Sequence, residues 1–220
     1  MKIAIDGPGG AGKSSMAKLL AARAGLVYVD TGAMYRTVGL YMRRHGADTS
    51  CSSEVVPLLG EVELEIRWTD AGQRMFLCGE DVSEAIRTPE ASLDASAVSA
   101  IPEVRQFLLK VQRDLCDKGN VIMDGRDIGT VIMPDADLKV FLTASPEARA
   151  RRRFDELISK GKDVKYEDVL AEMNQRDEKD SGRAVAPLVP AEDAVLLDNS
   201  DMNLEQTVDY IENLMKNVVL

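Results

Sequence analysis

Hydrophobic and polar positions follow two different periods along this chain of 220 residues. The opening stretch alternates short apolar runs with segments of helical spacing. It predicts a strand at Lys2 to Asp6, a helix at Ser14 to Ala24, a strand at Leu26 to Val29 and a helix at Ala33 to His45. Strands that alternate with helices in this way are typical of a parallel sheet in an α/β protein.

The period changes near residue 60, where apolar residues occupy every second position. These residues are Val62, Leu64, Ile66 and Trp68. A period of two with charged residues between indicates a half-exposed antiparallel strand. A turn at Asp70 to Gly72 then leads to a strand at Arg74 to Cys78, and Gly79 to Val82 predicts a third, shorter strand. We therefore expect a small β-rich insertion at about residues 60–95.

Helical spacing and buried strands alternate again from residue 90 to the end of the chain. The pattern predicts a helix at Glu90 to Lys118 that is broken near Pro102, strands at Asn120 to Met123, Leu138 to Leu142 and Ala194 to Leu197, and a helix at Tyr166 to Asp180. Ser145 is the expected cap of another helix, since Pro146 follows it. The closing helix carries an apolar stripe of Leu204, Val208, Ile211, Leu214 and Val218. A chain of this length, 45% hydrophobic, can bury one main core, so we expect a single domain.

A glycine-rich segment joins the first predicted strand to the first predicted helix. It reads Gly7-Pro8-Gly9-Gly10-Ala11-Gly12-Lys13-Ser14 and matches the phosphate-binding pattern G-x-x-x-x-G-K-[ST] in full. In such a loop backbone N–H groups bind phosphate oxygens, Lys13 neutralises the β- and γ-phosphates, and the Ser14 hydroxyl binds Mg²⁺. Because the match lies between a strand and a helix, the sequence favours a P-loop over a chance glycine-rich turn.

Charge and cysteine content narrow the class of protein. A formal net charge of −10 argues against non-specific binding to nucleic acid or to an anionic membrane, so an anionic substrate needs clustered arginines. The candidates are Arg36, Arg105, Arg126, Arg149, Arg151, Arg152, Arg153, Arg176 and Arg183. Three unpaired cysteines and a first apolar run, Ile3 to Ile5, that is too short for a signal peptide predict a cytoplasmic protein.

The P-loop predicts a nucleotide but leaves the reaction open. GTPases read guanine with an Asn-Lys-x-Asp segment, and the nearest segment here, Asn174 to Asp177, lacks the lysine and lies in a predicted helix. Motor-type ATPases usually place a glutamate after the acidic end of a strand, whereas Asp124 is followed by Gly125 and Arg126. Transfer to a second substrate, with water kept away, fits the residues better.

Three further segments combine arginine with aspartate or a small hydroxyl residue. They read DTGAMYR from Asp30, DGRDIGT from Asp124 and RDEKDSGRAVAPL from Arg176. On a helix, Arg176 and Asp180 share one face, and Arg183 continues it if the helix lasts so long. This face can meet a ribose and a phosphate together, although Arg176 and Asp180 alone also fit a surface ion pair.

The segments DTGAMYR, DGRDIGTV and RAVAPL, together with GPGGAGKS, resemble the signature segments of bacterial cytidylate kinases. The resemblance spans nearly the whole chain. It implies a three-layer P-loop NTPase fold with a parallel central sheet, in which the insertion at about 60–95 is a nucleoside-monophosphate lobe and about 146–190 form a helical lid. It also implies an enzyme that uses ATP and Mg²⁺ to phosphorylate CMP and dCMP, and that works as a cytoplasmic monomer.

The resemblance further implies which residues hold the acceptor. Those that read the cytosine edge are Ser96, Arg105 and Asp127, with Thr31 nearby where the family often has serine. Those that hold the pentose are Arg176 and Asp180. Those that clamp the acceptor phosphate, for which a guanidinium fork is well shaped, are Arg36, Arg126 and Arg183. Ser96 taken alone would be read as a helix-packing residue.

On the ATP side, the resemblance implies contacts from the P-loop through Ser15 and from arginines of the lid helix. We assign Arg151 and Arg153 to this role, although a run of arginines on a helix also fits a solvated face, and Arg152 is a third candidate. Asp124, at a strand end, can hold a water bound to Mg²⁺, for which Ser14 is the protein ligand. We expect Lys13, Arg126, Arg183 and Asp124 to be the catalytic residues.

The reaction that these residues predict is direct in-line transfer from ATP to the phosphate of CMP or dCMP. His45 is more consistent with a helix C-terminal cap than with a catalytic base. Two alternatives stay open from the sequence. One is a kinase for another small acceptor, such as UMP, AMP or shikimate, and the other is a non-catalytic sensor that binds ATP.

Overall fold

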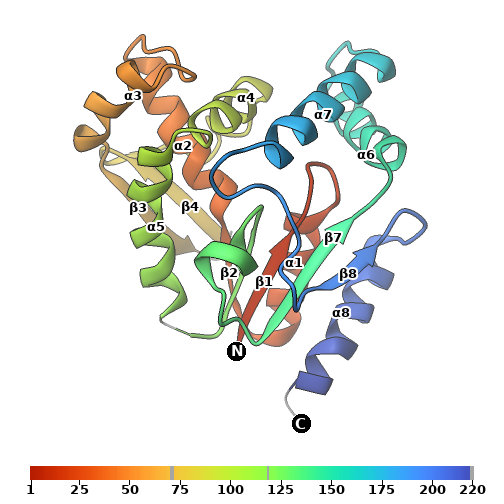
Figure 1. Ribbon diagram of the computed structural model, residues 1–220. Helices are drawn as coiled ribbons and strands as arrows, with labels where there is room; N and C mark the ends of the chain where they lie inside the picture. The colour runs from red at the N-terminus through yellow and green to blue at the C-terminus, as the bar shows by residue number, and fades with distance from the viewer. Residues whose placement is uncertain (70–71, 118, 219–220) are drawn as a thin grey trace. The chain divides into compact units, whose positions relative to one another are not determined.

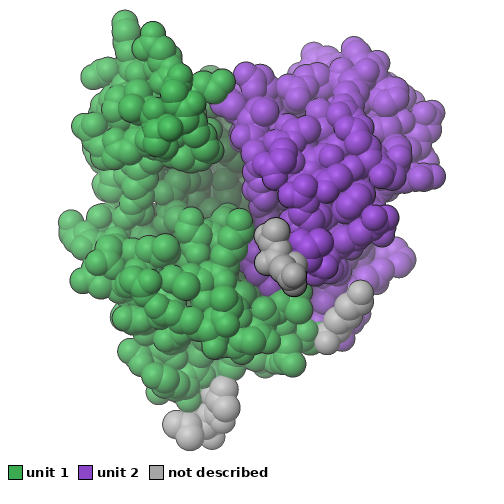
Figure 2. All heavy atoms as spheres, turned by 180° about the vertical axis from the view of Figure 1, so that it is seen from behind, with its two compact units in different colours: residues 1–27, 119–220 green, residues 28–118 purple. Residues whose placement is uncertain are grey.

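The computed structural model describes residues 1–69, 72–117 and 119–218, and the chain divides into two compact units. The first unit is built from residues 1–27 and 119–220 and the second from residues 28–118, coloured green and purple in Figure 2. The chain therefore leaves the first unit after residue 27 and returns to it at residue 119. Each unit has its own secondary structure.

The first unit is a parallel sheet with helices. Its elements are β1 (Lys2–Asp6), α1 (Lys13–Ala24), the start of β2 (Val27–Asp30), β6 (Val121–Gly125), a π-helical turn (Ile128–Ile132), β7 (Leu138–Thr143), α6 (Pro146–Ser159), α7 (Tyr166–Ser181), β8 (Val195–Asp198) and α8 (Leu204–Val218). The strand order is β2-β6-β1-β7-β8, and β1 pairs in parallel with both β6 and β7. Strands β1, β7 and β8 lie side by side in Figure 1. The predicted parallel α/β sheet is confirmed.

Complete burial explains why β1 is almost uniformly apolar. Ile3, Ala4 and Ile5 have no exposed surface, because strands lie on both sides of β1 in the sheet and helices pack on the sheet. In a parallel sheet all carboxyl ends lie at one edge. The loops that follow β1, β6, β7 and β8 therefore start from the same edge of the first unit.

Helices α6 and α7 form a pair with an apolar core of their own (Figure 1). The buried members of this core are Ala150, Leu157, Val169 and Met173. Ser145 caps α6 by accepting a hydrogen bond of 3.1 Å from the Ala148 N–H, as the sequence predicts. Helix α8 buries Val208 and Ile211 of its predicted stripe, whereas Leu204 and Val218 at its two ends are exposed.

The second unit combines helices with a small antiparallel sheet. Its elements, after β2, are α2 (Thr31–Arg44), α3 (Ser52–Leu58), a 3₁₀ turn (Leu59–Glu61), β3 (Leu64–Thr69), β4 (Gly72–Leu77), β5 (Glu80–Asp81), α4 (Pro89–Val98) and α5 (Pro102–Cys116). The sheet has the order β3-β4-β5, so the antiparallel strands predicted from the alternating pattern are present. The boundaries predicted for the insertion and the lid stay predictions.

Some details of the second unit differ from the expectation. The sequence pattern missed α3, a helix of 7 residues that contains Pro57. Trp68 is 41% exposed although its position in the alternation predicts a buried side chain, and its indole N–H donates to the Tyr28 carbonyl. His45 caps the C-terminus of α2 as predicted. Of the predicted turn at Asp70 to Gly72, residues 70 and 71 lie outside the described residues, as does Lys118 in the predicted helix.

Close packing of α2 against α4 determines which residue can occupy position 39. A Cβ placed on Gly39 would lie 2.6 Å from the Cβ of Asp94 and 3.1 Å from its backbone carbonyl carbon. Contacts this short with another helix's backbone are relieved only if the two helices move apart. Glycine at this position therefore permits the approach of α4.

We predict that Gly39→Ala lowers the free energy of unfolding by about 1–3 kcal/mol, because overpacking outweighs the gain of about 1 kcal/mol in helix propensity. Urea unfolding followed by circular dichroism measures this change. Gly60→Ala is the matched control, since a Cβ at Gly60 meets no atom within 4 Å. Equal stability of the Gly39→Ala variant and the parent chain would contradict the packing argument.

Candidate active site

The P-loop connects β1 to α1 at the carboxyl edge of the sheet. Gly7 has a φ of +144° and Gly10 a φ of +76°, which are conformations that L side chains rarely adopt. A Cβ on Gly7 would lie 1.9 Å from the Leu142 carbonyl oxygen on β7, and one on Gly10 would lie 2.6 Å from the Met173 side chain. The loop can therefore follow its course only with glycine at these positions.

The N-terminus of α1 follows the loop directly and carries no acidic residue in its own first turn. Gly12 is the N-cap, and among the described residues no side chain caps the helix there. The first N–H groups of a helix lack partners within the helix and carry a partial positive charge. This helix start can therefore bind an anion.

Lys13 is buried at the first position of α1, and its ammonium group donates to the Pro8 carbonyl oxygen at 2.8 Å. Burial is the largest effect on its pKa, and the guanidinium of Arg126 adds to it, so the pKa of Lys13 lies well below its usual value. An anionic ligand beside Lys13 would oppose both effects. Its own loop thus holds the ammonium group of Lys13 through the Pro8 carbonyl.

Ser14 and Asp124 place two oxygen atoms side by side next to the loop. The Ser14 hydroxyl donates to a carboxylate oxygen of Asp124 at 2.8 Å, and Asp124 is buried near the end of β6. Over the described ranges, no group of three or more His, Cys, Asp or Glu residues could hold a metal ion. A hydroxyl and a carboxylate nevertheless fit a P-loop Mg²⁺ site, where phosphate oxygens and water complete the ligands.

Three arginines surround one buried carboxylate in the first unit. Asp180, 1% exposed, accepts from Arg126 at 2.8 Å and from Arg183, and Arg176 approaches it at 4.0 Å. Burial alone would raise the pKa of Asp180, but the guanidinium groups of Arg126, Arg183 and Arg176 outweigh burial and lower this pKa. Three guanidinium groups gathered at one carboxylate present several N–H donors together, which suits an anionic ligand.

The arginine cluster lies against the P-loop. A Cβ placed on Gly9 would be 3.7 Å from a terminal nitrogen of Arg126 and 4.0 Å from one of Arg176. The structure thus brings Arg126, Arg176 and Asp180 close to the phosphate-binding loop, although they are more than 100 residues away in sequence. The roles that the sequence predicts for these residues stay predictions.

The second unit holds a similar group around Asp30. Its carboxylate accepts from Arg36 at 2.8 Å, from Arg87 at 3.0 Å and from the Ala33 N–H at 2.8 Å, which caps α2. Burial would raise the pKa of Asp30, but the two guanidinium groups and the backbone N–H outweigh burial and lower it. Gln73 on β4 adds hydrogen bonds to the backbone N–H and carbonyl of Asp30. Arg36 is therefore fixed in position by a buried counter-ion.

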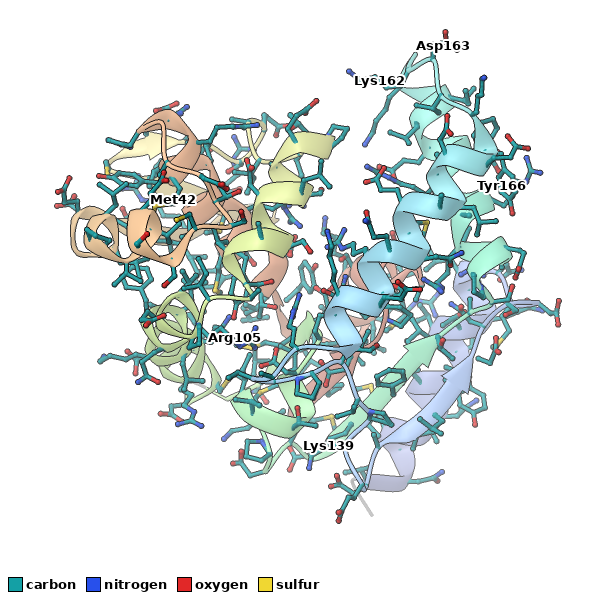
Figure 3. The ribbon with its side chains drawn as sticks, turned by 45° about the horizontal axis from the view of Figure 1, so that its top comes forward. Met42, Arg105, Lys139, Lys162, Asp163 and Tyr166 are labelled. Carbon is teal, nitrogen blue, oxygen red and sulfur yellow. The ribbon has the colours of Figure 1, made fainter. Side chains whose placement is uncertain are left out.

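The residues expected to read the base are divided between the units. Arg105 on α5, labelled in Figure 3, is 8% exposed, donates to the Ser99 carbonyl and lies with its guanidinium carbon 5.7 Å from the centroid of the Tyr35 ring. Thr31 is buried in the first turn of α2, and Ser96 is half-buried on α4. Asp127 is buried in the first unit, after β6. Their convergence on one base stays a prediction.

Comparison with known proteins identifies the family. The family model described as cytidylate kinase matches residues 3–217. A cytidylate kinase of Caldanaerobacter subterraneus subsp. tengcongensis is 50% identical over 218 residues, which cover 99% of this chain and 96% of that protein. One of Fervidobacterium nodosum is 48% identical over 215 residues, with coverages of 98% and 96%. The chain belongs to the cytidylate kinase family.

A solved structure with little sequence similarity shares the fold of this cytidylate kinase family member. It is that of an uncharacterized protein from Eubacterium ventriosum, which is 12% identical, covers 99% of this chain and 98% of its own, and superposes with a TM-score of 0.53. Among residues 1–69, 72–117 and 119–218, the longest helices are too short or too polar to cross a membrane.

The arginines of α6, a helix within the predicted lid region, take different positions from one another. Arg151 lies over the rings of Phe154 and Tyr166, with its guanidinium carbon 4.6 Å from the centroid of the Tyr166 ring, and Arg153 pairs with Glu156 at 2.8 Å. Their assignment to ATP stays a prediction. By contrast Arg149, which the assignment omitted, is buried and donates to the Gly9 carbonyl at 3.1 Å. In this structure the arginine that contacts the P-loop at Gly9 is thus the first of the four.

Asp6 is a second residue that the sequence reasoning did not assign. It ends β1, is 5% exposed, and accepts the backbone N–H groups of Ile128 and Gly129, both at 2.7 Å. Burial is the main reason why the pKa of Asp6 rises from 3.8 to about 6; the two N–H groups lower it, and the nearby Asp127 raises it further. A carboxylate directly before a P-loop was the available sequence signal. Asp6 ties the loop after β6, which carries Arg126, to the strand that leads into the P-loop.

We predict that Asp6 makes folding less favourable as the pH rises from about 4 to 6. A carboxyl group whose pKa is higher in the folded than in the unfolded state binds more protons when folded, so its contribution is largest below pH 4 and is lost through pH 6. From the raised pKa of about 6, the stability of the parent relative to Asp6→Asn should fall by up to about 3 kcal/mol over this range, and then stay constant.

Urea unfolding of both proteins at several pH values measures this difference, and contributions of other carboxyl groups cancel. Asp81→Asn is a control of opposite sign, because the pKa of Asp81 is lowered to about 2, chiefly by Ser83. Its parent should gain stability relative to the variant as the pH rises from 2 to 4. A pH-independent difference for Asp6→Asn would show that folding does not raise the pKa of Asp6.

Proposed function

We propose that this chain transfers the γ-phosphoryl group of ATP to CMP or dCMP, giving ADP and CDP or dCDP. The observation that carries the proposal is the group of three guanidinium groups around Asp180, placed against a P-loop. A P-loop accounts for the triphosphate, and the guanidinium groups beside it suit a second phosphate. Membership of the cytidylate kinase family supports cytidine as the nucleoside.

ATP is expected to bind along the P-loop from Gly7 to Ser15. Lys13 would exchange the Pro8 carbonyl for β- and γ-phosphate oxygens, and this exchange needs little movement because Lys13 already lies within the loop. Ser14 and Asp124 would hold Mg²⁺, directly and through water. When bound, Mg²⁺ neutralises charge on the phosphate oxygens. Arg151 and Arg153 are proposed to move onto ATP from the exposed face of α6.

The acceptor phosphate is expected to bind Arg36, Arg126 and Arg183. Each of these guanidinium groups now pairs with a buried aspartate, Arg36 with Asp30 and the other two with Asp180. A guanidinium group has five N–H donors, so it can keep its carboxylate and still donate to a phosphate. Asp180 and Arg176 are proposed to hold the pentose at the same time. Buried counter-ions therefore preorganise the clamp without cancelling its charge.

The cytosine base is expected to be read by Ser96, Arg105 and Asp127, with Thr31 nearby. Cytosine presents a ring nitrogen and a carbonyl as acceptors and an amino group as donor. The guanidinium of Arg105 matches the acceptors, and the Asp127 carboxylate matches the amino group. A uracil carbonyl in place of the amino group would face the carboxylate and repel it. This pairing is the proposed basis for preferring CMP to UMP.

In the transfer step a phosphate oxygen of CMP attacks the γ-phosphorus. The bond between phosphorus and that oxygen forms as the bond to the β,γ-bridging oxygen breaks, and ADP leaves with the bonding electrons. The attacking oxygen is already anionic at neutral pH, so the step requires no strong base. Lys13, Arg126 and Arg183 would stabilise the charge on the transferring group. The chain is further expected to be a cytoplasmic monomer with nucleotides as its ligands.

An assay of ADP release with several acceptors tests the proposal. CMP, dCMP, UMP, AMP and shikimate are supplied in parallel with ATP and Mg²⁺, and the product is identified by chromatography. We expect CMP and dCMP to give the highest kcat/KM. A clear preference for UMP, AMP or shikimate would overturn the assignment of the acceptor. ATP binding without ADP release for any acceptor would indicate a sensor instead of an enzyme.

We predict that Lys13→Ala lowers kcat with CMP by at least about 10²-fold, because a charged group aimed at the transferring phosphoryl is lost. Burial lowers the pKa of Lys13, which means that the folded protein destabilises the charged ammonium group. Removing this group should therefore leave the fold intact, which circular dichroism checks. Lys160→Ala is a control, as Lys160 is an exposed residue at the end of α6 that pairs with Glu156. Full activity of the Lys13→Ala variant would remove the P-loop from the reaction.

A further inference from the structure

Side chains from outside the P-loop hold the loop's carbonyl oxygens. Arg149 on α6 donates to the Gly9 carbonyl at 3.1 Å, and Asn199 donates through its side-chain amide to the Ala11 carbonyl at 3.0 Å. Lys13 donates to the Pro8 carbonyl at 2.8 Å. Arg152 on α6 also donates to the Ala11 carbonyl, at the longer distance of 3.5 Å. Of these four donors, Lys13 is the one that a nucleotide would draw away. Arg149 and Asn199 can keep their contacts while the phosphates bind.

Holding a carbonyl oxygen also determines where the next N–H points. A trans peptide is planar, and its C=O and N–H point in opposite directions. The described chain has no cis peptide bonds. With the Ala11 carbonyl held by Asn199, the Gly12 N–H is therefore directed away from Asn199. Gly12 is the N-cap of α1, where N–H groups bind phosphate in a P-loop.

Asn199 is itself firmly placed. It follows β8 directly, is 5% exposed, and its backbone N–H donates to the Thr143 carbonyl at the end of β7 at 2.9 Å. Its position at the carboxyl edge of the sheet is thus set by two neighbouring strands. A built Cβ on Gly12 would lie 3.9 Å from the Asn199 amide nitrogen, which places the side chain beside the start of α1.

The side-chain oxygen of Asn199 binds α6 through Arg152. Arg152 donates to the Asn199 side-chain oxygen at 3.0 Å and to its backbone carbonyl at 2.6 Å. Asn199 therefore donates to the P-loop and accepts from the lid helix at once, which only a side chain with both a donor and an acceptor can do. A carboxylate of the same shape could keep Arg152 but would repel the Ala11 carbonyl.

We propose that Asn199 is a positioning residue for ATP, which fixes the Ala11–Gly12 peptide so that its N–H faces the phosphates and anchors Arg152 of α6 to the same point. This inference rests on the proposed function for the identity of the ligand. It adds a residue from the β8 loop to the P-loop and lid residues already assigned. Asn199 acts through the peptide it holds and makes no contact with the reacting atoms.

Asn199→Ala and Asn199→Asp test the proposal, with ATP binding measured by calorimetry in the absence of any acceptor. The loss of one hydrogen bond that orients the loop should raise the Kd for ATP about 5–10-fold in Asn199→Ala. Asn199→Asp should show at least as large a rise, because it keeps the acceptor for Arg152 but cannot donate to Ala11. In steady-state assays the KM for ATP should rise in parallel, and the KM for CMP should change less than about twofold.

Asn203→Ala is the matched control. Asn203 is an asparagine four residues further on in the same loop, and its side chain accepts from the Gln206 N–H at the start of α8. Its loss should lower the melting temperature without changing the Kd for ATP. Asn199→Asp keeps the shape of the parent and decides the outcome if Asn199→Ala does not fold.

An Asn199→Asp protein that binds ATP as tightly as the parent would overturn the proposal. So would an Asn199→Ala protein in which KM for ATP and for CMP rise together, as a general loosening of the fold predicts. Because ATP binding is measured without acceptor, absence of CMP phosphorylation would contradict the proposed function but leave this test intact.

Discussion

The carboxylate of Asp180 gathers the guanidinium groups of Arg126, Arg183 and Arg176 at one place beside the P-loop. Placing like charges in a partly buried site costs free energy, which a bound phosphate ester would recover as binding energy. In the second unit, Asp30 likewise forms ion pairs with two guanidinium groups, those of Arg36 and Arg87. A chain with a net charge of −10 thus gathers guanidinium groups at the places where an anion is expected.

The carboxyl edge of the parallel sheet supplies the support for this charge. Asp6 at the end of β1 holds the loop after β6 through two backbone N–H groups, and Asn199 after β8 holds the P-loop through the Ala11 carbonyl. Neither residue needs to contact a substrate. Both fix backbone segments whose N–H groups or side chains are expected to contact it, so they reduce the freedom that would otherwise be lost on binding.

The sequence was sufficient for the parts of the molecule that depend on local pattern. Apolar runs and glycines located β1 and the P-loop, and Ser145 with Pro146 located the start of α6. The sequence pattern was insufficient where tertiary contacts determine the position of a side chain. The inner position of Arg149 depends on where α6 meets Gly9 and Asp177, and nothing in the run of arginines distinguishes it from Arg151. Helix α3 was missed because it is short and contains Pro57.

The order of the strands has a consequence for folding during synthesis on the ribosome. Strand β1 pairs with β6 and β7, whose residues are synthesised more than 110 positions later, whereas residues 28–118 form a unit from one continuous stretch. Contacts that distant in sequence require closure of a long loop before they form. During synthesis, β1 therefore stays without its neighbouring strands until all of residues 28–118 have left the ribosome. Over this time its apolar side chains remain exposed on the nascent chain.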